Sequence, residues 1–142
     1  MKDFIQFDGA LKENWYIAAL SKELSAKKPI SRKIYGKNYA IYRDAIGKVQ
    51  ALEDRCLHRG AKLSEGRCLK QGLTCPYHGL AYDNKGLVID IPSEGPYSEG
   101  LSATIQQRKW QISAPEVVEQ DGVIWMWLGS QLPKEKPSWR FP

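Results

Sequence analysis

Histidine and cysteine are scarce in this sequence, whose 142 residues include two histidines and three cysteines. Three cysteines are too few for a scaffold stapled by disulfides. No apolar run approaches the roughly 20 residues that a membrane-spanning helix requires, and residues 1–8 lack the apolar region of a secretory signal. No internal repeat is present. We therefore expect neither a membrane segment, nor a secretory leader, nor a repeat architecture.

The composition is that of a single globular domain. Hydrophobic residues make up 42% of the sequence and charged residues 26%, and 142 residues leave room for one domain. The last ten residues contain three prolines, Pro133, Pro137 and Pro142. We therefore expect one domain over residues 1–132 and a linker-like tail over residues 133–142.

Positive charge is concentrated in the first third of the chain. The net charge is +5, and residues 1–50 hold ten basic and five acidic side chains. Such a surface could steer an acidic partner protein, although a solvated lysine-rich surface without any partner would have the same composition. No long basic run and no basic-aromatic motif is present, so we expect no nucleic-acid partner and no membrane partner.

Short strands separated by turns dominate the predicted secondary structure, which is typical of an all-β sandwich or barrel. The run Val123–Leu128 has no polar alternation, so we expect it to be buried on both faces. Residues Glu13–Leu24 are predicted to form one short N-terminal helix, and residues 90–103 a long surface loop. The expected strands lie at residues 34–35, 39–43, 49–53, 79–82, 87–89, 104–113, 116–119 and 123–128.

Both histidines and two of the cysteines lie in two short segments. These are Cys56-Leu57-His58 and Cys75-Pro76-Tyr77-His78, with sixteen residues between His58 and Cys75. Two such loops can present two thiolates and two imidazoles, a donor set that suits zinc or an iron–sulfur cluster. A zinc finger takes its cysteines from one loop and its histidines from a helix, whereas each loop here supplies one of each. That alternation favours a cluster with two unlike irons.

The two segments closely resemble the Rieske [2Fe–2S] motif, through Cys56-x-His58-Arg59-Gly60 and Cys75-Pro76-Tyr77-His78-Gly79. The wider sequence resembles the N-terminal Rieske domain of Rieske non-haem iron oxygenases of the ring-hydroxylating and O-demethylating type. The matching stretches are residues 14–16, 54–59, 61–66 and 73–80. The resemblance implies an all-β, Rieske-type sandwich or barrel of short antiparallel strands, with a small cluster-binding subdomain at about residues 54–82.

The resemblance also assigns roles to individual residues. Cys56 and Cys75 would bind the inner iron of a Rieske-type [2Fe–2S] cluster, and His58 and His78 the outer, more exposed iron. Four neighbouring residues would surround the cluster: Arg59, Gly60, Tyr77 and Gly79.

Three positions predict a comparatively low reduction potential. Respiratory Rieske proteins carry two extra cysteines that staple the loops and a serine whose hydroxyl stabilises the reduced cluster. In this sequence the corresponding positions hold Ala61, Tyr77 and Leu80. Loss of a hydrogen-bond donor near a cluster that gains negative charge lowers its potential, so we expect the oxygenase-like class.

The resemblance implies one-electron transfer in an oxygenase system. The chain would accept electrons from a reductase or ferredoxin and deliver them to a mononuclear iron in an oxygenase catalytic domain. Such an iron is held by two further histidines and a carboxylate, and the sequence has no histidine beyond His58 and His78. We therefore expect an electron-transfer component of an oxidoreductase, with no catalytic residues and no catalytic mononuclear iron on this chain.

Three other interpretations stay open. The chain could be a free-standing Rieske ferredoxin, a zinc-binding structural module without redox function, or a regulatory fragment that keeps the cluster as a sensor. A spare thiol, Cys68, between the two ligand segments implies a reducing cytoplasm. We therefore expect a cytoplasmic protein.

Overall fold

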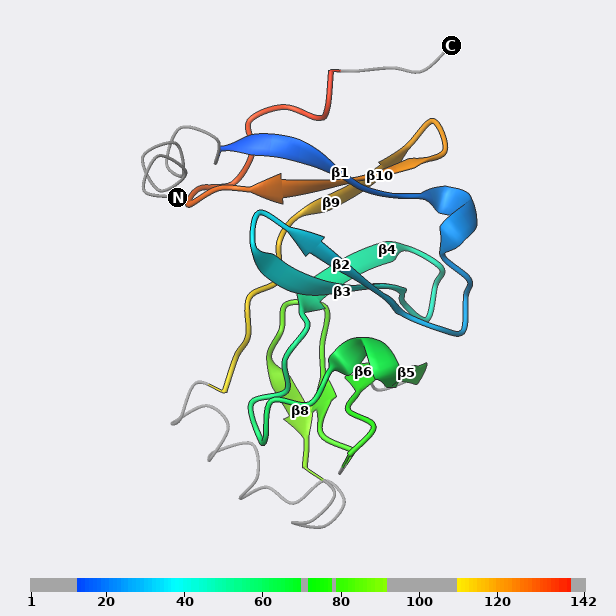
Figure 1. The fold of residues 1–142 in the computed structure, drawn as a ribbon, viewed down its shortest axis with the longest axis vertical. Helices are drawn as coiled ribbons and strands as arrows, with labels where there is room; N and C mark the ends of the chain where they lie inside the picture. Colours follow the sequence, from blue (N-terminus) through cyan, green and yellow to red (C-terminus); the bar gives the residue numbers. More distant parts are fainter. Residues whose placement is uncertain (1–12, 70–71, 78, 92–109, 139–142) are drawn as a thin grey trace.

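The computed structural model describes residues 13–69, 72–77, 79–91 and 110–138. Within these residues, ten strands form three antiparallel sheets that are stacked along the long axis of the molecule (Figure 1). The predicted all-β architecture is thereby confirmed. Of the predicted loop at 90–103, all but the first two residues lie outside the described residues, as does most of the strand predicted at 104–113.

Each sheet is formed by neighbouring strands that run antiparallel. Sheet A contains, in spatial order, β1 (Asn14–Leu20), β10 (Val123–Leu128) and β9 (Val117–Gln120). Sheet B contains β2 (Ile30–Ile34), β3 (Lys37–Arg43) and β4 (Val49–Glu53). Sheet C contains β5 (Arg67–Leu69), β6 (Gly72–Thr74), β7 (Ala81–Tyr82) and β8 (Val88–Asp90). Two 3-10 turns, η1 (Ser21–Glu23) and η2 (Leu63–Glu65), follow β1 and precede β5. No helix in the described residues is long and apolar enough to span a membrane.

Sheet B is the middle layer and is buried on both faces (Figure 1). Successive side chains of a strand point to opposite faces, so alternate side chains of β3 pack into two different cores. Tyr39 and Ile41 belong to the core between sheets A and B. Ala40 and Tyr42 belong to the core between sheets B and C. The segment that leaves β4 therefore starts from a strand that is packed from both sides.

Strand β10 is buried on both faces, as its sequence predicts. One face packs on sheet B, and the C-terminal segment crosses the other side of sheet A (Figure 1). Side chains of the sheet hold that segment through its carbonyl groups. Trp15 donates from Nε1 to the carbonyl of Glu135 at 2.9 Å, and Gln120 donates from Nε2 to the carbonyl of Pro137 at 3.1 Å.

The predicted N-terminal helix is wrong over most of its length. Residues Asn14–Leu20 form strand β1, and only Ser21–Glu23 are helical, as the 3-10 turn η1. Strand β1 pairs with β10, with Trp15 opposite Trp127, and a bulge follows Ile17. Pairing with a strand from the far end of the chain outweighs the weak local helix signal, because propensity is decided by tertiary context.

Two turns of the same sequence type link sheets B and C. The first turn, Asp44–Gly47, follows β3, and the second, Asp83–Gly86, follows β7. Each begins with an aspartate and ends with a glycine three residues later. Asn84 in the second turn donates from Nδ2 to Oδ2 of Asp44 in the first, at 3.2 Å. The buried Tyr42 hydroxyl donates to Oδ1 of Asn84 at 2.8 Å. Sheet C is thereby tied to the middle sheet.

Candidate metal centre

The first cysteine loop (residues 56–61, loop 1) follows β4 and is closed by two backbone hydrogen bonds. The N–H of Cys56 donates to the carbonyl of Ala61, and the N–H of Gly60 donates to the carbonyl of Cys56, both at 2.8 Å. Gly60 has φ +72°, a left-handed conformation that glycine adopts without the penalty of a Cβ atom. The chain therefore turns tightly around Cys56 and exposes the residues between.

The second cysteine loop (residues 75–80, loop 2) follows β6 and repeats this geometry. The N–H of Cys75 donates to the carbonyl of Leu80 at 2.8 Å, and the N–H of Gly79 donates to the carbonyl of Cys75 at 3.1 Å. Gly79 has φ +76°, close to the value at the matching position of loop 1. The two predicted ligand segments are therefore built as equivalent loops.

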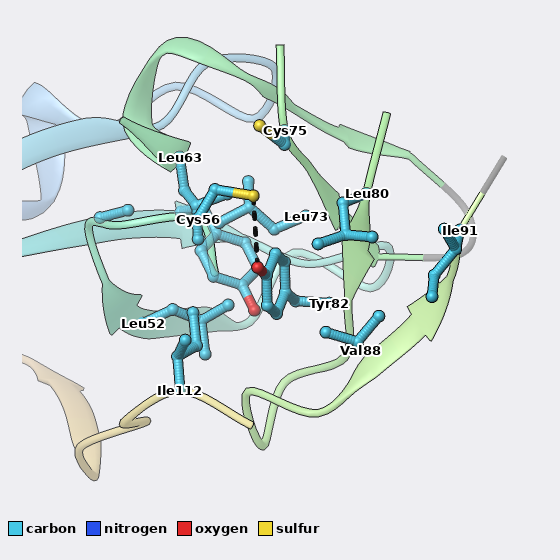
Figure 2. Packing of buried hydrophobic residues seen from close by; sticks show 12 residues of the cluster. Leu52, Cys56, Leu63, Leu73, Cys75, Leu80, Tyr82, Val88, Ile91 and Ile112 are labelled. Carbon is cyan, nitrogen blue, oxygen red and sulfur yellow. Dashed lines mark hydrogen bonds between the residues drawn. The ribbon is translucent and has the colours of Figure 1, made fainter. Parts of the chain in front are cut away.

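Both thiols lie in the core between sheets B and C. Cys56 is 2% exposed and Cys75 is 4% exposed, and both belong to the same cluster of buried residues. Figure 2 shows both sulfur atoms on the same side of this cluster, near Leu63 and away from Val88 and Ile91. The three cysteines, all within the described residues, form no disulfide. Apolar side chains thus exclude water from the two sulfur atoms.

Tyr82 on β7, two residues after loop 2, binds loop 1 through its hydroxyl group. The hydroxyl donates to Sγ of Cys56 at 3.4 Å (Figure 2). It also accepts the backbone N–H of Leu57 at 2.9 Å. Burial of the hydroxyl and its bond to Cys56 raise the pKa of Tyr82 well above its usual value, and Cys75 adds to the shift. Tyr82 therefore remains a protonated donor beside both thiols.

The tips of the two loops reach the surface. His58 is exposed, and so are Leu57 at 48% and Tyr77 at 70%. Arg59, predicted to surround the cluster, is also exposed and forms no ion pair with a described residue. His78, the fourth predicted ligand, lies outside the described residues. Each loop thus combines a buried thiol with an exposed tip.

The described donors fit the predicted cofactor. Among the described residues, no three His, Cys, Asp or Glu side chains lie close enough to hold a single metal ion. Two buried thiols in equivalent loops, with a hydroxyl that donates to one sulfur, provide the dry environment and the bonding that thiolate ligands of an iron–sulfur cluster require. The ligand set of Cys56, His58, Cys75 and His78 stays a prediction.

Cys68 lies apart from the two loops, on β5. Its side chain is partly buried against the same core, and desolvation raises the pKa of its thiol, with a further contribution from Asp44. A thiol with a raised pKa is a weak nucleophile and a weak ligand near neutral pH. The structure gives Cys68 a packing role.

Sequence reasoning missed two residues that the structure places beside the loops. Tyr82 was expected only as a strand residue, and Asp54 only as part of a matching stretch. The signal for Tyr82 was its position in a short strand directly after loop 2, where every second side chain faces the core. The buried carboxylate of Asp54 hydrogen-bonds Ser31 and Ser64, and neither contact could be read from local sequence.

Residues 14–113 match the Rieske [2Fe–2S] domain family. The chain belongs to this family. A Rieske domain holds its [2Fe–2S] cluster with two cysteines on one iron and two histidines on the other, so the cofactor prediction is confirmed at the level of the family.

Relatives of this Rieske domain are mostly larger oxygenase proteins. It is 40% identical over 120 residues to the oxygenase component of dicamba O-demethylase from Stenotrophomonas maltophilia. The aligned region covers 84% of the chain and 32% of that protein. It is 35% identical over 122 residues to the chloroplastic protein TIC 55 of Pisum sativum. That aligned region covers 85% of the chain and 21% of the TIC 55 protein. The chain thus spans about a third or less of the length of these relatives.

Solved structures support the same fold. The crystal structure of dicamba monooxygenase bound to dicamba has a TM-score of 0.70 and 38% sequence identity to this Rieske domain. The similarity covers 84% of the chain and 35% of the dicamba monooxygenase chain. The domain therefore corresponds to the Rieske part of an oxygenase component, and a role in electron transfer associated with an oxidoreductase follows.

Proposed function

We propose that this chain is the one-electron carrier of an oxygenase system, with its cluster held by Cys56, His58, Cys75 and His78. The observation that carries the proposal is the pair of equivalent loops, each with a buried cysteine and an exposed tip. When bound, a Rieske cluster supplies a site that takes up and releases one electron at a time. The names of the relatives, which include O-demethylase, monooxygenase and dioxygenase components, support an oxygenase as the electron acceptor.

The protein part has three tasks in this proposal. The core around Leu63, Leu73 and Leu80 keeps water from the sulfur atoms. Tyr82 donates a hydrogen bond to Cys56 and offsets negative charge there. The exposed loop tips bring the histidine side of the site to the surface, where an electron can cross to another protein.

The catalytic iron of the oxygenase lies outside this chain in our proposal. A mononuclear iron site of that class needs two histidines and a carboxylate. The sequence has two histidines, and both are assigned to the cluster. The domain boundaries, one Rieske domain over residues 1–132 with cluster-binding residues 54–82, and the cytoplasmic location belong to the same proposal.

The first experiment is iron and acid-labile sulfide analysis of the purified chain, combined with EPR of the dithionite-reduced protein. We expect two irons and two sulfides per chain and a Rieske-type EPR signal. Cys75→Ser and His58→Ala should abolish this signal, whereas Cys68→Ser, the matched control, should preserve it. A colourless, EPR-silent protein that contains zinc would refute the proposal in favour of a structural module.

The electron donor in this proposal is an acidic protein that docks on the loop tips. Residues 55–67 carry four exposed basic side chains, those of Arg55, Arg59, Lys62 and Arg67, and one exposed acidic side chain. None of the four forms an ion pair with a described residue. Loop 1 and the residues next to it therefore carry an excess of exposed positive charge, and an acidic ferredoxin or reductase would be steered towards it.

The docking surface is tested by charge reversal. Arg59→Glu should slow reduction of the chain by an acidic [2Fe–2S] ferredoxin by about tenfold or more at low salt, and the difference should shrink at high salt. Lys28→Glu is the matched control, because Lys28 is an equally exposed cation in the turn between η1 and β2. Equal slowing by both variants would show that only net charge matters and would exclude a docking role for the loop tips.

A further inference from the structure

A buried aspartate side chain lies directly before loop 1 in the chain. Asp54 lies two residues before Cys56 and is 6% exposed. Its Oδ1 accepts the backbone N–H of Ser64 at 2.7 Å, and its Oδ2 accepts the hydroxyls of Ser64 and Ser31, each at 2.7 Å. Its own backbone N–H donates to the carbonyl of Asn38 at 3.0 Å. Asp54 is thus fixed to sheet B and in turn holds Ser64.

The bonds to Asp54 are short and all come from neutral donors. Burying a carboxylate is costly unless hydrogen bonds satisfy it, and no cation among the described residues forms an ion pair with Asp54. Removing Ser64 from this position would leave a buried carboxyl group short of two of its three hydrogen-bond donors, so the contact resists opening.

Ser64 belongs to the 3-10 turn η2, whose C-terminal end lies against the end of β6, directly before loop 2. Gly66 closes this turn with an ordinary φ of −85°. A Cβ atom at Gly66 would lie 1.9 Å from the carbonyl oxygen of Thr74, so only glycine permits this approach. Thr74 is the residue directly before Cys75. The turn therefore touches the approach to loop 1 at one end and the approach to loop 2 at the other.

We propose that Asp54, Ser64, Gly66 and Thr74 form a brace that fixes the distance between the two cysteine loops. Each loop is closed by its own backbone hydrogen bonds, which set its shape, whereas its position and its resistance to opening depend on the elements packed against it. The relative position of the loops depends on links between the elements that carry them. Tyr82, two residues after loop 2, binds loop 1, and the brace adds a link that continues into the pairing of β5 with β6 at Thr74. Asp54 and Gly66 are positioning residues, and the inference rests on the proposed role of the loops as cluster ligands.

The test uses Ser64→Ala and Gly66→Ala in the purified, full-length chain. Ser64→Ala removes one bond to Asp54, and Gly66→Ala must push Thr74 away. We expect each variant to lose iron to a chelator about 10-fold to 100-fold faster than the wild type, the range typical for residues that support metal ligands. The g-values of the reduced protein should also shift, because the thiolates are displaced.

Two matched controls separate the brace from general instability. Ser25→Ala removes a hydrogen-bonded serine hydroxyl outside the cluster region, one that accepts the backbone N–H of Lys28 at 3.2 Å. Gly36→Ala places a methyl group at a glycine of φ +79° with no atom within 4 Å. Both controls should keep the iron-release rate and the g-values of the wild type, even where Gly36→Ala lowers the melting temperature.

Amide hydrogen exchange provides a readout that does not depend on what the loops hold. The N–H groups of Cys75 and Gly79 are bonded within loop 2, and neither substitution lies in that loop. We expect both amides to exchange about tenfold faster in Ser64→Ala, since each 1.4 kcal/mol of lost protection corresponds to a factor of ten. Wild-type exchange at both amides in folded Ser64→Ala would overturn the brace.

The outcomes keep this inference separate from the proposed function. A wild-type chain without a Rieske EPR signal would refute the proposed function, and the exchange rates in loop 2 would still decide the brace. A wild-type chain with that signal, together with variants of unchanged g-values and iron release, would refute the brace alone. Should Gly66→Ala fail to fold, Ser64→Ala decides the question by itself.

Discussion

Replacing Tyr82 by phenylalanine should lower the reduction potential of the centre. The substitution removes one oxygen atom, and with it the hydrogen bond to Sγ of Cys56 at 3.4 Å. Reduction adds negative charge at the cluster, so a donor to a thiolate ligand stabilises the reduced form more than the oxidised form. A hydrogen bond to a charged group contributes about 1.5–3 kcal/mol. If about 1.4 kcal/mol of this hydrogen-bond energy is present only in the reduced form, its loss lowers the one-electron reduction potential by about 60 mV.

The same substitution should also destabilise the fold, for a different reason. The hydroxyl of Tyr82 accepts the backbone N–H of Leu57 at 2.9 Å, and phenylalanine would leave that group without this acceptor. An unsatisfied, partly buried N–H costs about 1–3 kcal/mol of unfolding free energy. A loss of stability alone therefore does not test the role of Tyr82 at the cluster.

Tyr42→Phe is the matched control for this effect. Tyr42 is buried in the same core to a similar degree, and its hydroxyl donates to Asn84 at 2.8 Å and to no sulfur atom. Both variants lose one buried hydroxyl, so both should lower the melting temperature. Only Tyr82→Phe should change the potential, because of these two hydroxyls only that of Tyr82 contacts a thiol proposed as a ligand.

The assay is a redox titration of each purified protein, followed by EPR or by protein-film voltammetry. We expect a lower midpoint potential for Tyr82→Phe and the wild-type value for Tyr42→Phe. Equal midpoint potentials in all three proteins would refute the assignment of Cys56 as a ligand or the electrostatic role of Tyr82. The EPR signal of Cys56→Ser distinguishes these two cases, because loss of a ligand would abolish it.

Three further predictions concern stability and the spare thiol. Arg43→Met should lower the unfolding free energy by up to about 1 kcal/mol at pH 7, because its two-pronged pair with Glu119 is partly exposed. The bonds from Arg43 lower the pKa of Glu119, so this contribution is present above the unfolded-state pKa and should vanish in denaturation experiments as the pH falls through the folded-state pKa. Gly86→Ala would place a Cβ atom 2.1 Å from a backbone carbonyl oxygen, and calorimetry should show a cost above about 3 kcal/mol, compared with about 1–2 kcal/mol for Gly36→Ala, which has open space. Cys68→Ser should keep the visible spectrum of the wild type, and a bleached variant would contradict its packing role.

The sequence was most informative where chemistry is encoded locally. The loops at Cys56 and Cys75 could be recognised from the histidine that follows each cysteine at short spacing and from the glycine after it, because a tight loop is determined by a few consecutive residues. Likewise, Val123–Leu128 could be placed in a buried strand, since a run without polar alternation fits no exposed position. Both features depend on neighbours in the chain.

Features that depend on distant pairing could not be predicted in this way. Strand β1 was expected as a helix, because no sequence pattern near Asn14–Leu20 indicates that residues 123–128 are its partner strand. Strands β5 and β6 have three residues each and were missed inside a segment without clear periodicity. Their pairing is fixed by the surrounding core and not by a recognisable pattern.

The layered fold explains why the loops can be both exposed and well fixed. Loop 1 leaves β4, which lies in a sheet packed from both sides, and Asp54 binds that exit to β2 through Ser31 and to η2 through Ser64. Loop 2 leaves β6, which η2 contacts at Gly66. Precise placement of ligands requires support from rigid elements behind them. The exposed tips can therefore meet a partner while the thiols behind them stay in place, and this combination suits a site that must exchange electrons repeatedly without rearranging.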